Sequence, residues 1–239
     1  MNNLLHGDCL ELMKDIPDNS IDLCLTDPPY GTTACKWDSV IPFEPMWEQL
    51  KRITKDNGAI CLFGSEPFSS HLRLSNIKMF KYDWIWNKSK ASNFPNAKKH
   101  PLKITEIISV FGGRKYYPIM TEGKRRVKGG YYSKGDAAIN TSGTPLKINN
   151  LYYPKNIINI STANNKDTKL HPTQKPVALL EYLIKTYTLE GETVLDFTMG
   201  SGSTGVAAKN LNRKFIGIEK EERYFDMGVR RLNENLKTK

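Results

Sequence analysis

The segment from Thr193 to Glu219 constrains the fold more than any other part of the sequence. An apolar run, a glycine-rich turn, an amphipathic run, a second apolar run and an acid follow one another there. Its glycines, Gly200, Gly202 and Gly205, have the G-x-G-x-x-G spacing of a tight turn between a strand and a helix. A strand–helix–strand unit of this kind connects parallel strands, so the segment predicts an α/β fold with a parallel sheet.

The same alternation covers most of the 239 residues, which suit one α/β domain. The pattern lapses in residues 112–170, which we interpret as a loop-rich insertion between segments 1–111 and 171–239, with short strands near Tyr131–Tyr132 and Asn156–Ile160. Seven strands are predicted elsewhere, at Asn3–His6, Ile21–Thr26, Ala59–Phe63, Tyr82–Trp86, Thr105–Phe111, Thr193–Phe197 and Lys214–Glu219. Six helices are predicted, at Leu10–Lys14, Phe43–Thr54, Pro67–Ile77, Pro176–Thr188, Ser203–Leu211 and Glu221–Leu236.

The glycine turn also indicates the kind of ligand. Glu219 ends the second strand 19 residues after Gly200, where an acid can accept hydrogen bonds from ribose hydroxyls. The residues from Asp196 to Met199 lengthen the turn, which suits an adenosyl amino acid with a cationic amine better than a dinucleotide. No Lys follows the glycines, which argues against a phosphate-binding loop. A turn that binds nothing remains an alternative, because any tight strand–helix connection can use glycines.

A second segment, Asp27-Pro28-Pro29-Tyr30, directly follows the apolar run Ile21–Thr26. The prolines stiffen the backbone, so the acid and the aromatic ring are held in place. Ligands of open α/β sheets bind beyond the carboxyl ends of strands, which is where this segment lies. A carboxylate and a proline carbonyl can accept hydrogen bonds from an amino group, while a tyrosine ring can stack on a base. The alternative is a strand-to-loop turn capped by Asp27.

Positive charge is concentrated in one part of the chain. Residues 81–135 hold 13 Lys and Arg against 3 Asp and Glu, whereas the remaining residues hold 22 of each. The whole net charge of +10 therefore lies in that segment. A local basic field favours a polyanion, usually nucleic acid, although a solvated surface has the same composition.

The sequence gives no sign of export, membrane insertion or zinc binding. No apolar run reaches 18 residues and no signal peptide is evident, so we expect a cytoplasmic protein without membrane contact. The four cysteines lack the spacing of a zinc site. Cys24 and Cys61 lie in apolar runs and are expected to be buried thiols.

Together these segments resemble the beta group of DNA amino-methyltransferases, which modify adenine N6 or cytosine N4. The resemblance runs from Leu5 to about Leu232, with Asp-Pro-Pro-Tyr first, the basic segment next and the glycine turn last. It implies the Rossmann-like fold of S-adenosylmethionine-dependent methyltransferases, with a mostly parallel seven-stranded sheet that contains one antiparallel strand. It also implies a catalytic half in 1–111, a target-recognition insertion in 112–170 and a cofactor-binding half in 171–239.

The resemblance assigns roles residue by residue. Relatives usually carry a proline after the acid that corresponds to Asp196, which this chain lacks. Asp8 could equally cap the helix Leu10–Lys14. The implied catalytic residues are Asp27, Pro28, Pro29 and Tyr30. The implied cofactor residues are Asp8, Lys175, Asp196, Phe197, Gly200, Gly202 and Glu219, with Phe197 as the ring that stacks on the cofactor adenine.

The resemblance further implies double-stranded DNA as the partner and S-adenosylmethionine as the methyl donor. The target base would be flipped out of the duplex, stacked on Tyr30 and methylated directly, with no metal and no covalent enzyme intermediate. Adenine N6 is the expected target, since cytosine-N4 members more often have Ser in place of Asp27. A homodimer and a role in restriction–modification also fit the family. The residues expected at DNA phosphates are Lys88, Lys90, Lys98, Lys99, Arg125 and Arg126, with Phe94 near the flipped base.

Three other activities compete with this hypothesis. Cytosine-N4 methylation uses the same motifs. A nicotinamide-dependent oxidoreductase could use the same glycine turn and acid. A catalytically silent DNA-binding protein would explain the basic segment but not Asp-Pro-Pro-Tyr. Carbon-5 methylation of cytosine needs a Pro-Cys motif, and the sequence contains none.

Overall fold

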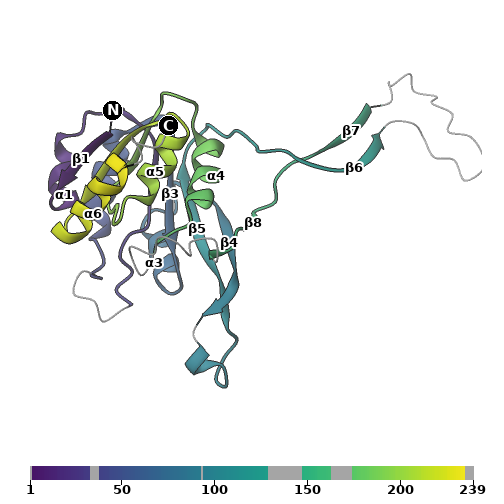
Figure 1. Ribbon diagram of the computed structural model, residues 1–239, viewed down its shortest axis with the longest axis horizontal. Helices are drawn as coiled ribbons and strands as arrows, with labels where there is room; N and C mark the ends of the chain where they lie inside the picture. Colours follow the sequence, from purple (N-terminus) through teal and green to yellow (C-terminus); the bar gives the residue numbers. More distant parts are fainter. Residues whose placement is uncertain (1, 33–37, 93, 129–146, 163–173, 235–239) are drawn as a thin grey trace, which may run out of the picture. The chain divides into compact units, whose positions relative to one another are not determined.

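The computed structural model describes residues 2–32, 38–92, 94–128, 147–162 and 174–234. The chain divides into two compact units, one made of Met1–Tyr117 with Asn156–Lys239 and one made of Pro118–Lys155. Figure 1 follows the elements of both units along the chain. Both motifs predicted from the sequence lie in the larger unit.

An eight-stranded sheet forms the centre of the larger unit, in the order β1-β10-β9-β2-β3-β5-β4-β8. In the described part of this sheet, β5 alone runs antiparallel to its neighbours. The seven predicted strands are all present, and the single antiparallel strand is confirmed. The strands are β1 (Asn2–His6), β2 (Ile21–Thr26), β3 (Thr54–Gly64), β4 (Phe80–Ser92), β5 (Lys103–Gly112), β8 (Ile157–Asn159), β9 (Thr193–Asp196) and β10 (Lys214–Glu219).

The eighth strand, β8, lies within residues 112–170 and matches the short strand predicted near Asn156–Ile160. The main sheet was expected to contain seven strands without it, so the predicted number was one too low. β8 pairs with β4 in parallel at the edge of the sheet. The Trp86 indole N–H donates to the Ile160 carbonyl at 2.8 Å, and the Asn87 amide donates to Asn159 Oδ1 at 2.9 Å. The three residues of β8 have no periodicity that would place the strand in the main sheet, so that position follows from the contacts with β4.

Helices cover both faces of the sheet (Figure 1). One face carries α4 (Val177–Tyr187), α5 (Ser203–Asn210) and α6 (Glu222–Glu234). The other carries α1 (Cys9–Leu12), α2 (Phe43–Ile53) and α3 (Phe68–Ser75), and the short 3-10 turn η1 (Met13–Asp15) extends α1. Across the described ranges, we find no helix of the length and hydropathy needed to cross a membrane.

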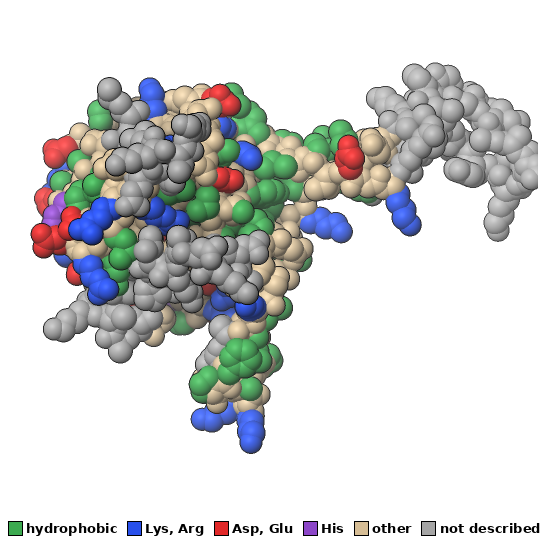
Figure 2. Space-filling view, in the orientation of Figure 1, with side chains coloured by type: hydrophobic (Ala, Val, Ile, Leu, Met, Phe, Trp, Pro, Cys, Tyr) green, Lys and Arg blue, Asp and Glu red, His purple; other side chains and the backbone are tan. Residues whose placement is uncertain are grey.

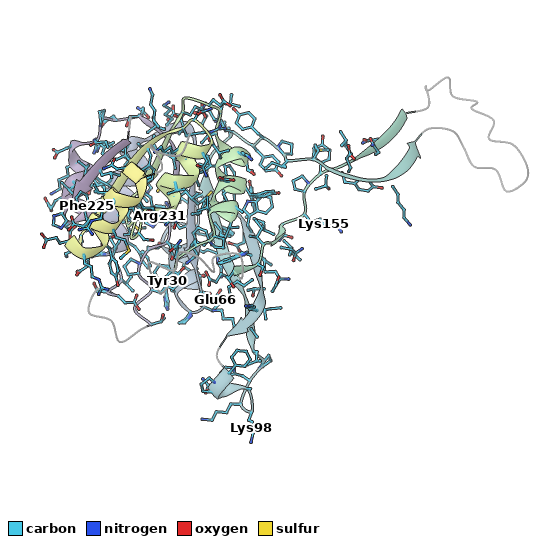
Figure 3. The ribbon with its side chains drawn as sticks, in the orientation of Figure 1. Tyr30, Glu66, Lys98, Lys155, Phe225 and Arg231 are labelled. Atoms are coloured by element: carbon cyan, nitrogen blue, oxygen red, sulfur yellow. The ribbon has the colours of Figure 1, made fainter. Side chains whose placement is uncertain are left out.

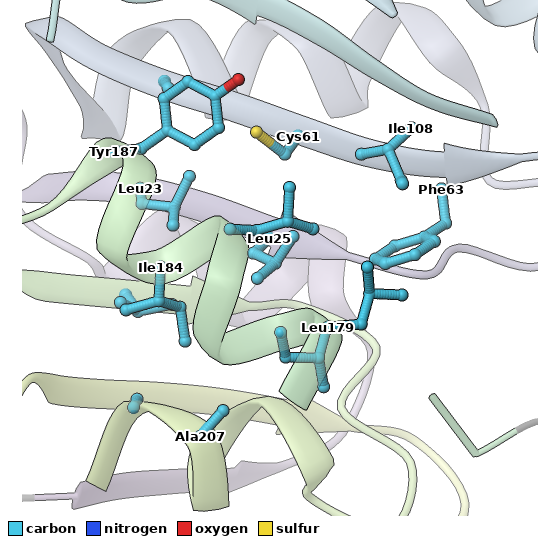
Figure 4. Close-up of a cluster of buried hydrophobic side chains, with 14 of the residues drawn as sticks. Leu23, Leu25, Cys61, Phe63, Ile108, Leu179, Ile184, Tyr187 and Ala207 are labelled. Atoms are coloured by element: carbon cyan, nitrogen blue, oxygen red, sulfur yellow. The ribbon is translucent and has the colours of Figure 1, made fainter. Parts of the chain in front are cut away.

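Two clusters of buried apolar side chains join the helices to the sheet. Because successive strand residues point to opposite faces, Cys24 packs beneath α2 and α3, while Leu25 and Cys61 pack beneath α4 and α5. Figure 4 shows the second of these clusters around Leu179 and Ile184 of α4. Cys24 and Cys61 are fully buried, as predicted. Burial of every residue of β2 is typical of a central parallel strand covered on both faces.

Strands β4 and β5 continue beyond the other strands as a hairpin (Figure 1). Their pairing reaches Ser92 and Lys103, well past the predicted end of β4 at Trp86. A 3-10 turn, η2 (Phe94–Asn96), lies between the strands, and Lys98 lies at the tip (Figure 3). The residues after Trp86 are almost all polar, so alternation of polar and apolar residues does not reveal them as strand.

The smaller unit contains an antiparallel pair, β6 (Thr121–Lys128) and β7 (Lys147–Tyr152). The Tyr152 hydroxyl donates to the Lys124 carbonyl at 2.7 Å across the pair. Charged residues dominate β6, so its sequence does not resemble a half-buried strand. The strand suggested near Tyr131–Tyr132 lies outside the described residues.

Candidate active site

A cavity of about 950 Å³ opens at the carboxyl ends of the parallel strands. Residues that follow β1, β2, β9 and β10 line it, as expected for the edge where open α/β sheets bind ligands. Its volume lies in the range of about 300–1,000 Å³ typical of small-molecule sites. Of the predicted catalytic and cofactor residues, Gly202 alone is absent from its wall. The others all line it: Asp8, Asp27, Pro28, Pro29, Tyr30, Lys175, Asp196, Phe197, Gly200 and Glu219.

The Asp27 carboxylate is held from two sides. The Tyr30 hydroxyl donates to its Oδ1, and the Lys175 ammonium donates to its Oδ2. The Tyr30 ring stacks on Phe68, with ring centroids 4.9 Å apart and an interplanar angle of 29°. The segment that follows β2 therefore places an oriented carboxylate and an aromatic ring in the cavity wall.

Asp38 fixes the backbone that follows this segment. Its Oδ1 accepts the N–H groups of Tyr30 and Gly31 at 2.8 and 2.9 Å, and its Oδ2 accepts the N–H of Thr32 at 2.9 Å. Gly31 has a φ of +67°, which a residue with a side chain rarely adopts. Sequence reasoning missed Asp38, because nothing in its spacing marks it as the acceptor for a turn several residues earlier.

The glycine turn has the predicted strand–turn–helix geometry. Gly200 and Gly202 have φ values of +51° and +74°, in the left-handed region that favours glycine. The Gly202 N–H donates to the Met199 carbonyl at 2.9 Å. Gly205 is required by packing, because a Cβ there would lie 2.7 Å from the Phe215 ring. The three glycines thus meet two different requirements, backbone conformation and close packing.

Glu219 ends β10, with 9% of its surface exposed. Its carboxylate accepts the backbone N–H of Gly200 at 2.8 Å and that of Glu221 at 2.9 Å. Burial raises the pKa of Glu219 despite these hydrogen bonds. The acid therefore supports the glycine turn while it lines the cavity.

Asp196 is a buried acid at the end of β9, where the loop that leads to the glycine turn begins. Burial raises its pKa to about 7, against the opposing effect of hydrogen bonds from Thr204 and the Thr198 N–H. The Thr198 hydroxyl donates to the Asp27 carbonyl oxygen at 3.1 Å. This contact joins the loop after β9 to the loop after β2, so the two motifs form one wall.

Asp8 caps α1, as the alternative interpretation of this residue predicted. Its carboxylate accepts the Leu10 N–H at 2.9 Å and the Lys220 ammonium at 3.1 Å. It also lines the cavity, so the cap and a cofactor contact are compatible. The ring of His6, at the end of β1, stacks on that of Phe225 in α6, with ring centroids 5.1 Å apart.

Phe197 is almost completely enclosed by protein, with 1% of its surface exposed. It packs in the cluster beneath α2 and α3, and its N–H donates to Thr26 Oγ1 at 3.2 Å. A ring enclosed in this way offers little surface for stacking on the adenine of a cofactor. The structure therefore assigns Phe197 mainly to the core.

Four charged side chains in the cavity wall, named here the charge cluster, are Asp27, Lys88, Glu106 and Lys175. Lys88 Nζ lies 3.1 Å from Glu106 Oε1, and Lys175 Nζ lies 3.4 Å from Glu106 Oε2. Burial would lower the pKa of Lys175, but the carboxylates of Asp27 and Glu106 outweigh it and raise that pKa. Burial likewise opposes ionisation of Glu106, yet Lys175 and Lys88 hold its pKa below the usual value. Both shifts favour the charged forms of Glu106 and Lys175.

Glu106 was also missed from the sequence. A lone acid near the start of the apolar run Thr105–Phe111 was the available signal. Its meaning depends on Lys88 from the neighbouring strand and on Lys175, which is 69 residues away in the chain. Only the folded arrangement brings these three residues together.

The predicted DNA-contacting residues lie in three settings. Lys98 and Lys99 are exposed at the tip of the β4–β5 hairpin, and Lys90 is exposed at the cavity. Lys88 instead belongs to the charge cluster, with its side chain 14% exposed. Arg125 and Arg126 lie on β6 of the smaller unit, and their side chains are outside the described residues.

The residues in the cavity wall fit S-adenosylmethionine. Glu219 provides an acid at the end of β10, beside a glycine turn whose backbone has room for a ligand. Asp196 provides a carboxyl group for a cationic amine. The cavity volume of about 950 Å³ is ample for an adenosyl amino acid and part of a second ligand.

Comparisons with known proteins agree with this arrangement. The family model for N6/N4 methyltransferases, described as DNA methylase, matches residues 21–230. The Type II methyltransferase M.HinfI of Haemophilus influenzae is 29% identical over 267 residues, which cover 98% of this chain and 69% of that protein.

Two solved structures extend the comparison to the fold. The M1.HpyAVI–SAM complex has a TM-score of 0.67 and 26% identity, covering 98% of this chain and 100% of that chain. The cytosine-N4-specific PvuII DNA methyltransferase shares the fold, with a TM-score of 0.65 and 19% identity over 95% of this chain and 85% of that one. The family match sets aside the oxidoreductase considered from the sequence. The chain therefore belongs to the N6/N4 family of S-adenosylmethionine-dependent DNA methyltransferases.

Proposed function

We propose that the chain methylates the N6 amino group of adenine in double-stranded DNA, after the base has been flipped out of the duplex. One observation carries this proposal. Asp27 and Tyr30 line the same cavity as Asp196, Gly200 and Glu219. An acceptor for the target amine and the acids suited to the cofactor thus face one space, as direct transfer between two bound partners requires.

The residues of the chain position the target in the proposed reaction. S-adenosylmethionine, when bound, supplies a methyl group on a positively charged sulfur. Asp27 and the Pro28 carbonyl accept hydrogen bonds from the amino group, which favours exposure of the nitrogen lone pair. The base stacks on the face of Tyr30 that Phe68 does not cover. Catalysis then comes from alignment and electrostatics, and the cost of flipping the base is about a few kcal/mol.

The choice of adenine over cytosine rests on Asp27. Cytosine-N4 members of the family more often have Ser at this position, whereas this chain has an acid. The fold does not discriminate, since the cytosine-N4-specific PvuII enzyme shares it. Because M.HinfI is a Type II methyltransferase, we further infer action at a defined site within restriction–modification.

Sequencing that maps modified bases in DNA from cells expressing the protein tests this proposal. We expect N6-methyladenine at one recurring site, absent from cells that carry Asp27→Ala. N4-methylcytosine at a recurring site would show that the target base is cytosine and not adenine. Unmodified DNA from cells that contain folded protein would contradict the proposal as a whole.

The affinity for S-adenosylmethionine should depend on pH through Asp196. Its raised pKa of about 7 leaves the carboxyl protonated in acid, so a cationic amine loses its partner as the pH falls through 7. Calorimetry between about pH 5.5 and 7.5, below the α-amino pKa of about 7.7–8.0, should show affinity rising with pH. The limiting slope is about tenfold per pH unit. The Asp196→Asn variant should bind more weakly and with little pH dependence; an equally steep dependence in that variant would contradict this role.

The β4–β5 hairpin is the part of the larger unit best suited to DNA. Its tip exposes Lys98, Lys99 and Phe94, the last with 65% of its surface. Figure 2 shows basic side chains beside an apolar surface at this tip. Strand β4 of the hairpin lines the cavity at Lys90 and Ala91, close to the end of the strand at Ser92. Duplex DNA against the tip would therefore bring a flipped base close to the cavity.

Replacing Lys98, Lys99, Arg125 and Arg126 by Gln should weaken DNA binding without changing cofactor affinity. Each lost phosphate contact should flatten the salt dependence by about 0.9 log units per log of salt. We would measure affinity across a salt series, on cognate and random duplexes. A double variant, Lys98→Gln with Lys99→Gln, has a control that removes the same number of charges. The control is Lys51→Gln with Lys185→Gln, two residues that are exposed on α2 and α4. If the quadruple variant has the same salt dependence as the parent, the basic segment is a solvated surface that does not contact phosphates.

Three further features of the chain stay predictions. We propose segments 1–111 and 171–239 as the catalytic and cofactor-binding halves, and 112–170 as the target-recognition region. β8 belongs to the main sheet, so the recognition role would fall on the residues before it. We likewise propose a homodimer and a cytoplasmic location.

A further inference from the structure

The charge cluster offers Lys175 two carboxylates. Its ammonium donates to Asp27 Oδ2 and lies 3.4 Å from Glu106 Oε2. That Glu106 oxygen is buried and makes no hydrogen bond among the described residues, because its ion-pair contact with Lys175 lacks hydrogen-bond geometry. Lys88 holds the other oxygen of Glu106 at 3.1 Å. Glu106 is therefore a fixed carboxylate with one acceptor position turned toward Lys175.

Asp27 has both oxygens engaged, by the Tyr30 hydroxyl and by Lys175. A carboxylate oxygen can accept a second hydrogen bond, so a target amine could enter beside Lys175. It would then meet an ammonium at close range while its own nitrogen gains positive charge as the methyl group arrives. Like charges repel strongly in a partly buried site, so Lys175 on Asp27 opposes the reaction that Asp27 is proposed to assist.

We propose that Glu106 is a positioning residue for methyl transfer, which takes over the Lys175 ammonium when the target amino group reaches Asp27. The move needs the Lys175–Glu106 contact to shorten from 3.4 Å to a charge-assisted hydrogen bond of about 2.8 Å. The ammonium lies 5.0 Å from the centre of the Phe63 ring, which supports its positive charge beside the two acids. The inference rests on the proposed function, because it needs an amino group at Asp27.

Glu106→Gln tests the proposal, since it keeps the size of the side chain and removes its charge. Lys175 should then stay on Asp27, so the single-turnover rate of methyl transfer should fall about tenfold or more, within the coupling range of contacting residues. The dissociation constant for S-adenosylmethionine, measured by calorimetry, should change by less than about twofold, because additive effects of independent sites agree within a few tenths of a kcal/mol. The assay uses tritiated S-adenosylmethionine at saturation and enzyme in excess over DNA, so product release does not enter the rate.

The same change in a Lys175→Met background separates positioning from a structural role. Without the ammonium, Glu106 has nothing to draw away from Asp27, so Glu106→Gln should have no further effect on the rate. A structural role, or a role through Lys88, would slow transfer equally in both backgrounds. If Glu106→Gln has a lowered melting temperature, Glu106→Asp replaces it, because the shorter side chain withdraws the carboxylate by one methylene. Its single-turnover rates are then compared in the parent and Lys175→Met backgrounds.

Three results would overturn the proposal. One is a parental single-turnover rate in Glu106→Gln, and another is an undiminished loss in the Lys175→Met background. The third is a complete loss of transfer in Lys175→Met at saturating cofactor, which would make Lys175 itself necessary for the step. Tritium counts methyl groups on either base, so a cytosine target leaves this test intact. An active parent with an unaffected Glu106→Gln variant refutes the inference alone, whereas an inactive parent refutes the proposed function as well.

Discussion

Asp27→Ala is expected to abolish methyl transfer while the protein still binds S-adenosylmethionine. The carboxylate is the oriented acceptor at the end of β2, and removal of one preorganised polar group from an active site costs about 10²–10³ in kcat. Calorimetry with the cofactor and a tritiated methyl assay measure the two properties separately. Cofactor affinity should stay close to that of the parent, because the glycine turn and Glu219 are untouched.

Asp27→Asn is the matched control for this variant. Its amide oxygen can still accept the Tyr30 hydroxyl, so the loop keeps its shape, but Lys175 loses an ionic partner. Equal melting temperatures for parent and control, together with lost transfer, would separate chemistry from folding. A rate in Asp27→Ala within about tenfold of the parental rate corresponds to about 1.4 kcal/mol of activation free energy or less. That result would contradict a catalytic role for Asp27.

Glu219→Ala is expected to weaken S-adenosylmethionine binding by about 10- to 150-fold. Hydrogen bonds to a charged group contribute about 1.5–3 kcal/mol, which corresponds to that range of dissociation constants. The ribose hydroxyls would lose their acceptor. The N–H groups of Gly200 and Glu221 would lose theirs too, because the same carboxylate accepts both. Calorimetry gives the affinity, and thermal melting reports whether the turn is still supported.

Glu219→Gln separates these two effects. Its amide oxygen can still accept the Gly200 N–H, whereas the charge that favours ribose hydrogen bonds is gone. An intermediate affinity with a parental melting temperature would assign the difference to the ligand. Parental affinity in a correctly folded Glu219→Ala variant would show that the acid does not contact the cofactor.

The sequence predicted those parts of the fold that short-range patterns determine. The glycine turn was found because Gly200 and Gly202 adopt positive φ values that few other residues tolerate. Burial on both faces made β2 a continuous apolar run, which is also visible in the sequence. The short strand predicted near Asn156–Ile160 is present as β8. Its place in the main sheet and the outer part of the β4–β5 hairpin were missed, because pairing with neighbouring strands determines both.

The candidate site divides in the same way. Asp27, Asp196 and Glu219 were predicted because each comes at the end of a strand, and such ends meet at one edge of the sheet. The partners of these acids were not predicted. Lys175 meets Asp27 across 148 residues of chain, and their contact follows from the docking of α4 rather than from any local signal. Phe197 shows the converse, since its position in the motif suggested stacking while the packing encloses its ring.

Mass spectrometry of nucleosides identifies the methylated base and the position of the methyl group in one measurement. Purified protein is incubated with unmethylated double-stranded DNA and S-adenosylmethionine that carries a trideuterated methyl group, and the DNA is then digested. We expect trideuterated N6-methyldeoxyadenosine in the parent reaction and none with Asp27→Ala. Label on N4 of cytosine would contradict the choice of adenine. Label on carbon 5 of cytosine, or no labelled nucleoside from a folded protein that binds the cofactor, would contradict transfer to an exocyclic amino group.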